Sequence, residues 1–184
     1  MTYWYEDIAL GSPYPLGAHT FSEEEIVAFA AEFDPQYFHI DKEAARHSHF
    51  GSLIASGWHT VCVGHRIMVD TLFTQADLLR AKGETPGVTG PSPGVNKMVF
   101  KAPVRAGDTI SYALTVRQKR PSQSLPGWGV LITAIEAHNQ HGALVYHAEV
   151  VGFSKQRDFR PNLTQRLLIA LGGLPGLGRI VRGR

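Results

Sequence analysis

Asp34 and His39 lie five positions apart in the segment FDPQYFHID, which follows a stretch with helical periodicity. A loop without a chemical role more often consists of Gly, Ser and Asn, whereas this segment is stiff and apolar. A carboxylate and an imidazole on one rigid segment can hold a single water molecule between them. The carboxylate can then accept a proton from the water, and the imidazolium can donate a proton to carbon. The neighbours Phe33, Tyr37 and Phe38 are expected to keep bulk water away from the pair.

A second chemical element is expected at Ser56 and Gly57, in the sequence ASGW. Ser56 can cap a helix that begins at Gly57. The backbone N–H groups at such a helix start stabilise negative charge, for example on the oxygen of an enolising thioester. Gly57 has no side chain, so a ligand carbonyl can approach its backbone closely. The two elements together would supply a proton-transfer pair and an oxyanion site.

A helix is expected to position the proton-transfer pair. It begins at Ser22, which can form a capping box with Glu25, and an apolar stripe at helical spacing follows. This helix should end before Pro35, because the residue before a proline avoids the helical region. A short helical turn is expected from Asp41 to about Arg46.

A longer helix and a sheet are expected after the candidate site. The helix that begins at Gly57 is apolar on most faces, which predicts burial on most sides, and residues 76–94 indicate fraying and then a loop. After Gly94 the apolar residues recur at every second position, as in strands. The expected strands are Asn96 to Val104, Thr109 to Arg120, Trp128 to His138 and Ala143 to Lys155. A hairpin turn is expected at residues 139–142. We therefore predict an α+β fold in which a short first strand and these four form an antiparallel sheet wrapped around one long central helix.

The composition limits the possible classes of protein. The chain has 184 residues, 43% of them hydrophobic, and a formal net charge of +2. These values predict a packed core and give no argument for nucleic-acid binding. The single cysteine, Cys62, excludes an intramolecular disulfide and a cysteine-based zinc site. Neither a signal peptide nor a membrane-spanning segment is expected, so a cytoplasmic protein is predicted.

One domain is expected to span residues 1–158, followed by a tail of residues 159–184. The tail is apolar and rich in Gly and Pro, and it contains arginines but no acidic residue. Such a tail packs on a neighbouring subunit or is partly disordered. Contact with a membrane surface or with a phosphorylated ligand is the alternative interpretation.

The segment FDPQYFHID resembles the hydratase motif of the MaoC-like dehydratases, a family related to the (R)-specific enoyl-CoA hydratases and built on the hotdog fold. That motif reads Gly-Asp-x-Asn-Pro-x-His, with a longer variant, and Asp34 and His39 keep the family's spacing. FGSLIASGW at residues 50–58 is similar to the start of the family's central helix. KMVFKAPV at residues 97–104, followed by Gly107 and Asp108, is similar to one of its strand segments.

The resemblance covers residues 21–153, and three separated motifs in the family's order make it specific for the superfamily. Gln36 replaces the usual asparagine, Tyr37 stands where proline is usual, and His65 stands where some hydratases have serine. These departures concern the choice of substrate more than the type of reaction, because the proton-transfer pair is present.

The resemblance implies an acyl-CoA hydratase or dehydratase. A 2-enoyl-CoA thioester would bind with its carbonyl oxygen at the Gly57 amide, beside Ser56. Asp34 would act as the base on the shared water, and His39 would protonate the α-carbon, giving a 3-hydroxyacyl-CoA. No metal or redox cofactor would be needed, and a homodimer or a dimer of dimers is implied because hotdog sites are normally completed across a dimer. Low-ranking candidates for substrate contacts are Tyr37, Phe38, His65, Asn96 and Lys97.

Other interpretations of the same residues stay open. Asp34 could brace a turn, His39 could be a buried structural histidine, and Gly57 could be only a glycine at a helix start. A hotdog thioesterase is the first alternative function, although the first turns of the helix from Gly57 carry no carboxylate. A non-catalytic acyl-thioester binder is the second, although such a protein would be free to lose Asp34 and His39. No metal site is expected, since His47 and His49 have poor ligand spacing.

Three further cations admit two interpretations. Lys97, Lys101 and Arg105 follow one predicted strand and its exit. They are either ordinary solvated charges or contacts for the phosphates of CoA.

Overall fold

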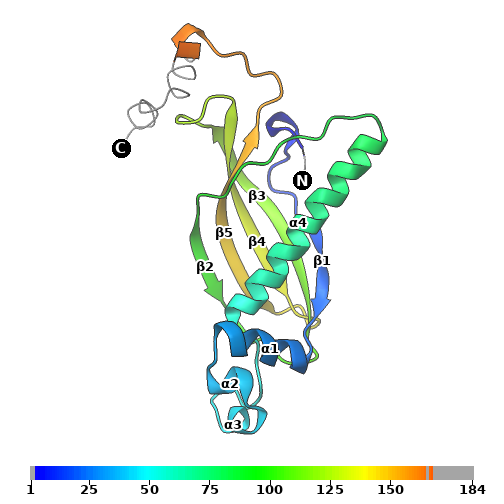
Figure 1. Cartoon of the computed structure of the whole chain (residues 1–184), viewed down its shortest axis with the longest axis vertical. Helices are drawn as coiled ribbons and strands as arrows, with labels where there is room; N and C mark the ends of the chain where they lie inside the picture. Colours follow the sequence, from blue (N-terminus) through cyan, green and yellow to red (C-terminus); the bar gives the residue numbers. More distant parts are fainter. Residues whose placement is uncertain (1–2, 165, 168–184) are drawn as a thin grey trace.

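The computed structural model of the chain describes residues 3–164 and 166–167. A five-stranded antiparallel sheet in the order β1-β3-β4-β5-β2 forms its centre, and one long helix, α4, runs diagonally across the sheet (Figure 1). The strands are β1 (Tyr14–Thr20), β2 (Gly94–Phe100), β3 (Thr109–Pro121), β4 (Trp128–His138) and β5 (Leu144–Lys155). The predicted α+β fold is confirmed. Most of the predicted tail lies outside the described residues.

Helix α4 (Gly57–Ala81) packs closely on β3 at one small residue. A Cβ atom at Gly64 would lie 2.5 Å from the ring of Tyr112, so only glycine lets the helix approach the sheet to this distance. The Tyr112 hydroxyl donates a 2.9 Å hydrogen bond to the backbone carbonyl of Thr60 on α4. Burial raises the pKa of Tyr112, so the hydroxyl remains a hydrogen-bond donor at physiological pH. These contacts fix the start of α4 against the sheet.

The core lies between α4, α1 and the facing side of the sheet. Its largest fully buried side chains are Phe21, Ile26, Ile110, Tyr112, Val116 and Val145.

The opposite face of α4 is exposed in the single chain, which corrects the prediction that the helix is buried on most sides. A stripe at helical spacing consists of Trp58, Cys62, Val69 and Phe73, with Trp58 58% and Phe73 66% exposed. Cys62, predicted to be inside a buried helix, is exposed. The apolar pattern covers two faces of the helix, and the sheet of one chain covers one of them.

Three helices lie together at the start of α4 (Figure 1): α1 (Glu23–Phe33), α2 (Tyr37–Ile40) and α3 (Lys42–Arg46). Ser22 caps α1 by accepting from the Glu25 amide at 3.2 Å, which confirms the predicted helix start, and α1 ends before Pro35 as predicted. The Glu25 side chain contacts His19 at 2.8 Å. Asp41 caps α3 through the amides of the two residues that follow Lys42, so the predicted helical turn is confirmed.

The predicted ends of two elements were wrong. Strand β2 begins at Gly94 and ends at Phe100, so the segment through Pro103 to Val104 lies outside it. Helix α4 continues to Ala81, beyond the predicted fraying at residue 76. The hairpin turn at residues 139–142 is confirmed, and Gly142 has the positive φ of 79° that favours glycine there. In the described part of the chain no helix combines the length and the apolarity needed to cross a bilayer.

Candidate active site

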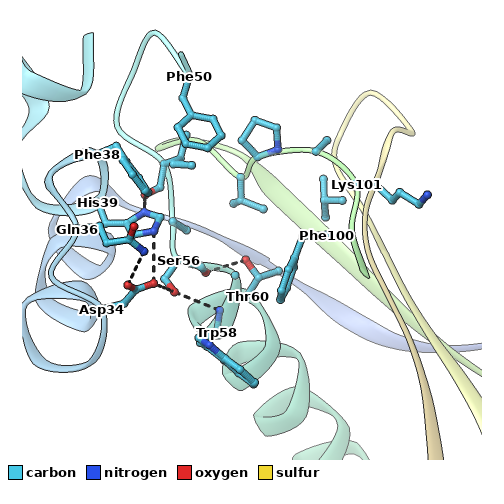
Figure 2. A pocket seen from close by; sticks show the side chains of 17 residues that line it. Asp34, Gln36, Phe38, His39, Phe50, Ser56, Trp58, Thr60, Phe100 and Lys101 are labelled. Atoms are coloured by element: carbon cyan, nitrogen blue, oxygen red, sulfur yellow. Dashed lines mark hydrogen bonds and ion pairs between the residues drawn. The ribbon is translucent and has the colours of Figure 1, made fainter. Parts of the chain in front are cut away.

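A cavity of about 460 Å³ lies where the α1–α2 connection, the start of α4 and the segment after β2 meet. Its lining is mostly apolar and includes four aromatic side chains, those of Phe38, Phe50, Trp58 and Phe100. Asp34, His39 and Ser56 gather at one end of it (Figure 2). The sequence therefore brings the predicted proton-transfer pair and the predicted helix start into one site.

Both carboxylate oxygens of Asp34 accept hydrogen bonds. The Ser56 hydroxyl donates to Oδ2 at 2.6 Å, and the Gln36 side-chain amide donates to Oδ1 at 2.9 Å. The hydrogen bond from Ser56 lowers the pKa of the Asp34 carboxyl, and Gln36 and His39 act in the same direction, against the effect of desolvation. Asp34 is thus an ionised carboxylate at neutral pH, held in one orientation.

His39 on α2 is 5% exposed, and its two ring nitrogens have different partners. Nδ1 lies 2.8 Å from the backbone carbonyl of Ile54, which can only accept, so Nδ1 carries a proton. Nε2 faces Asp34 Oδ2 at 3.4 Å. The Ile54 carbonyl therefore leaves Nε2 as the ring atom that can gain or lose a proton beside the carboxylate.

Ser56 and Gly57 form the start of α4, as predicted. The Ser56 hydroxyl oxygen accepts from the Trp58 amide at 3.2 Å while donating to Asp34. Gly57 is the first helical residue, so its amide has no acceptor within the helix. A Cβ atom at Gly57 would lie 2.7 Å from the Phe100 ring, which covers this side of the glycine. Only glycine fits under Phe100 without a shift of the ring.

Some of the predicted substrate-contact residues line the cavity and others do not. Phe38 lines the cavity, whereas Tyr37 is 50% exposed and does not. Phe33, expected to keep water away, is 64% exposed and does not line the cavity either. The expectation that all three aromatic residues enclose the pair was therefore wrong for Phe33 and Tyr37.

Three other predicted contacts also lie away from the cavity of this chain. His65 is exposed on α4, and Lys97 is exposed on β2. Asn96 donates to Glu149 on β5 at 2.8 Å. Their predicted roles rest on the sequence alone.

Several lining residues were missed by sequence reasoning. Gln36 could have been found, because it occupies the asparagine position of the family motif. Thr60 lies four residues after Ser56, on the same helix face, and could also have been found. The place of Phe100 depends on where β2 ends, which the alternation of apolar residues did not show, and Lys101, which also lines the cavity, had been named only as a possible phosphate contact. In Figure 2 the Lys101 side chain points away from Asp34 and His39.

Within residues 3–164 and 166–167, no group of three His, Cys, Asp or Glu side chains is arranged to hold a metal ion. The site chemistry described below uses the side chains and backbone amides of the chain.

An antiparallel five-stranded sheet on one long helix, with this pair beside the helix start, defines a protein with the hotdog fold. The family model of the MaoC like domain matches residues 9–127. The chain therefore belongs to the MaoC-like domain family, as the sequence motifs predicted.

Known proteins resemble the chain over most of its length. The crystal structure of the MaoC-like dehydratase from Rhodospirillum rubrum is 31% identical, with a TM-score of 0.69, covering 85% of this chain and 99% of that one. The uncharacterized protein YdeM of Bacillus subtilis is 26% identical over 145 residues, 79% of this chain and 94% of YdeM. The unliganded (R)-hydratase PhaJ1 of Pseudomonas aeruginosa is 20% identical, with a TM-score of 0.56, covering 86% of this chain and 94% of PhaJ1. The last similarity concerns the fold alone.

Proposed function

We propose that the chain catalyses the reversible addition of water to a 2-enoyl-CoA thioester, giving a 3-hydroxyacyl-CoA. The observation that carries this proposal is the 3.4 Å separation of Asp34 Oδ2 and His39 Nε2 at the end of a mostly apolar cavity. One water molecule beside both atoms could contact both. The MaoC-like dehydratase among the similar structures supports the same reaction type.

The proton steps follow from the two hydrogen-bond environments. In the hydration direction, water oxygen bonds to the β-carbon and gives its proton to the Asp34 carboxylate. The imidazolium of His39 gives its Nε2 proton to the α-carbon, since the Nδ1 proton is held by Ile54. A proton then passes from Asp34 to Nε2, which restores the starting ion pair. Dehydration is the reverse sequence.

The thioester carbonyl is assigned to the Gly57 amide. That amide is free of the helix ladder and lies at the positive end of a 25-residue helix, where it stabilises the enolate oxygen. Ser56 acts next to it as a positioning residue, because its hydroxyl is bonded to Asp34. The reaction requires no metal or redox cofactor in this scheme.

The proposal includes a homodimer, or a dimer of dimers, built on the outer face of α4. Trp58, Cys62, Val69 and Phe73 place apolar side chains on this face in two groups, with the exposed Arg66 between them, and exposed apolar groups of this kind mark surfaces that partners cover. Trp58 also lines the candidate active site. A second copy packed on this stripe would therefore border the substrate cavity.

The test is the loss of the enoyl absorbance of a panel of 2-enoyl-CoA esters. Asp34→Asn removes the base and His39→Gln removes the acid, so each is expected to lower kcat by about 10²- to 10⁴-fold in a folded protein. Matched controls are Asp77→Asn and His47→Gln, which change an exposed carboxylate and an exposed imidazole outside the cavity.

Thiol release from the same esters separates hydration from hydrolysis. If free CoA is released while no 3-hydroxyacyl-CoA forms, the protein is a thioesterase and the proposal is refuted. Tight binding of an ester with no turnover would assign a non-catalytic binder.

A further inference from the structure

A second cavity, of about 230 Å³, borders the same two chain segments as the candidate active site. Ile54 and Arg105 form an isolated antiparallel β-bridge that joins these segments. Ile54 and Val104 line the first cavity, whereas their neighbours Leu53 and Arg105 line the second. Since consecutive Cα atoms are about 3.8 Å apart, the two cavities lie side by side across this bridge.

Every charged side chain that lines the second cavity is a cation. Lys42 and Arg46 reach it from α3, and Arg105 reaches it from the segment after β2. The remaining lining residues are small or apolar: Gly51, Ser52, Leu53 and Ala106. Three cations from two separate segments thus converge on a small hollow, which makes the cavity a candidate anion site.

The three cations differ in how far their charge is compensated. Lys42 contacts Glu23 at 2.5 Å, and Arg46 contacts Glu43 at 2.7 Å. Among the described residues, no carboxylate lies within 4 Å of the Arg105 guanidinium. It donates to the Phe50 carbonyl at 3.0 Å and to the Ser52 hydroxyl, which are neutral.

The backbone around Arg105 is fixed independently of its side chain. The Arg105 amide donates to the Asp108 carboxylate at 2.8 Å, and the other oxygen of Asp108 accepts from Gln140 at 2.8 Å. Asp108 therefore holds the backbone and leaves the guanidinium charge uncompensated. An anion in the cavity would meet a preformed cation whose position is set by neutral acceptors.

Three converging cations suit a ligand that carries more than one negative charge, such as a diphosphate, better than they suit a single carboxylate. A guanidinium presents parallel N–H groups that match two oxygens of one phosphate, and a lysine ammonium adds a point charge. Two guanidinium groups and one ammonium suit a ligand with adjacent phosphates. In a CoA thioester, a diphosphate lies at the end of the pantetheine arm opposite the acyl group.

We propose that the cavity between α3 and Arg105 binds the diphosphate of CoA while the acyl thioester occupies the neighbouring cavity. This inference rests on the proposed function for the position of the acyl group. It assigns carrier recognition to Lys42, Arg46 and Arg105, and catalysis to residues on the other side of the bridge.

The experiment compares a 2-enoyl-CoA ester with the pantetheine ester of the same acyl group, which has no diphosphate. Arg46→Gln and Arg105→Gln are each expected to lower kcat/KM for the CoA ester about tenfold, through KM, because a charge-assisted contact is lost. The values for the pantetheine ester should not change. The parent should prefer the CoA ester, and this preference should weaken as salt is raised.

Arg80→Gln is the matched control. Arg80 pairs with Asp77 at 2.7 Å across three residues of a helix, as Arg46 pairs with Glu43, and the two arginine side chains are 62% and 58% exposed. This variant should keep the parent's values for both esters. Equal losses on both esters in Arg46→Gln and Arg105→Gln would show a structural role and overturn the proposal, as would a parent without preference for CoA.

A calorimetric titration with free CoA and with pantetheine separates this proposal from the proposed function. If neither ester is hydrated, the proposed function fails, yet CoA binding that is weakened in Arg46→Gln and Arg105→Gln would still support the diphosphate site. Absence of CoA binding to the parent would overturn it. The parent could instead prefer an ester carried on a carrier protein over the CoA ester. If Arg46→Gln and Arg105→Gln lose that preference, the diphosphate proposal is overturned and the cavity is assigned to a protein partner.

Discussion

Ser56 takes part in two interactions that the sequence did not connect. Its hydroxyl caps α4 and also donates to Asp34, which lies 22 residues earlier in the chain. Spacing within a loop predicted Asp34 and His39 as a pair, because both lie on one short segment. The contact between Asp34 and Ser56 depends on how two segments pack together, which no local pattern shows.

Ser56→Ala is expected to shift the acid limb of the pH profile of kcat/KM to higher pH. The hydrogen bond from Ser56 is the main cause of the lowered pKa of Asp34, so its loss lets the carboxylate protonate at higher pH. The pH dependence of stability should change in the same sense. Ionised Asp34 stabilises the fold above its unfolded-state pKa, and this contribution is lost as the pH falls through the lowered folded-state pKa.

The control for this prediction is Ser22→Ala. Ser22 caps α1 through the Glu25 amide, and its hydroxyl is not bonded to Asp34. Both variants should lose about 1 kcal/mol of stability through the missing cap. An acid limb that moves equally in both, or in neither, would contradict the assigned role of Ser56.

At the scale of elements, the periodicity of the sequence predicted the helices and the long strands, but the ends of β2 were wrong for a physical reason. Alternation continues past Phe100 to Val104, although the backbone has already left the sheet. The pairing partner of a strand decides where the strand ends, and pairing is a long-range property. The position of Phe100 over Gly57 could not be predicted for the same reason.

Gly64→Ala is expected to destabilise the fold by about 1–3 kcal/mol, despite the better helix propensity of alanine. Its Cβ would lie 2.5 Å from the Tyr112 ring, which is fully buried and held by its hydrogen bond to Thr60. Denaturant unfolding measures the change. Gly152→Ala in β5 is the control, since a Cβ there meets no atom within 4 Å. Equal stability of the two variants would show that α4 can move away from the sheet at little cost.

At the scale of the whole molecule, α4 is less buried in a single chain than its sequence predicted. The sequence places apolar residues on two faces of α4, and the sheet covers one. Sequence reasoning attributed both faces to the core of a single chain because periodicity does not distinguish an interior from an interface. The stripe of Trp58, Cys62, Val69 and Phe73, in which Val69 is half-buried and the others are exposed, is the part of α4 that the core of one chain does not cover.

Light scattering coupled to size-exclusion chromatography should show at least a dimer for the parent chain. Phe73→Glu places a charge on the most exposed apolar residue of the proposed interface and is expected to weaken association by tenfold or more, about 1.4 kcal/mol. Leu10→Glu, at a residue 50% exposed and outside α4, should leave the oligomeric state unchanged. A parent that remains monomeric over the whole concentration range would refute the dimer.

The backbone and the side chain of Ile54 have different roles. Its carbonyl accepts from His39, and the residue also lines the cavity of the candidate active site. A backbone carbonyl is present whatever the side chain is, so the tautomer of His39 does not depend on the identity of residue 54. A substitution of Ile54 can therefore change the shape of this cavity, and under the proposed function the acyl chains that it accepts, while the orientation of the His39 ring is kept.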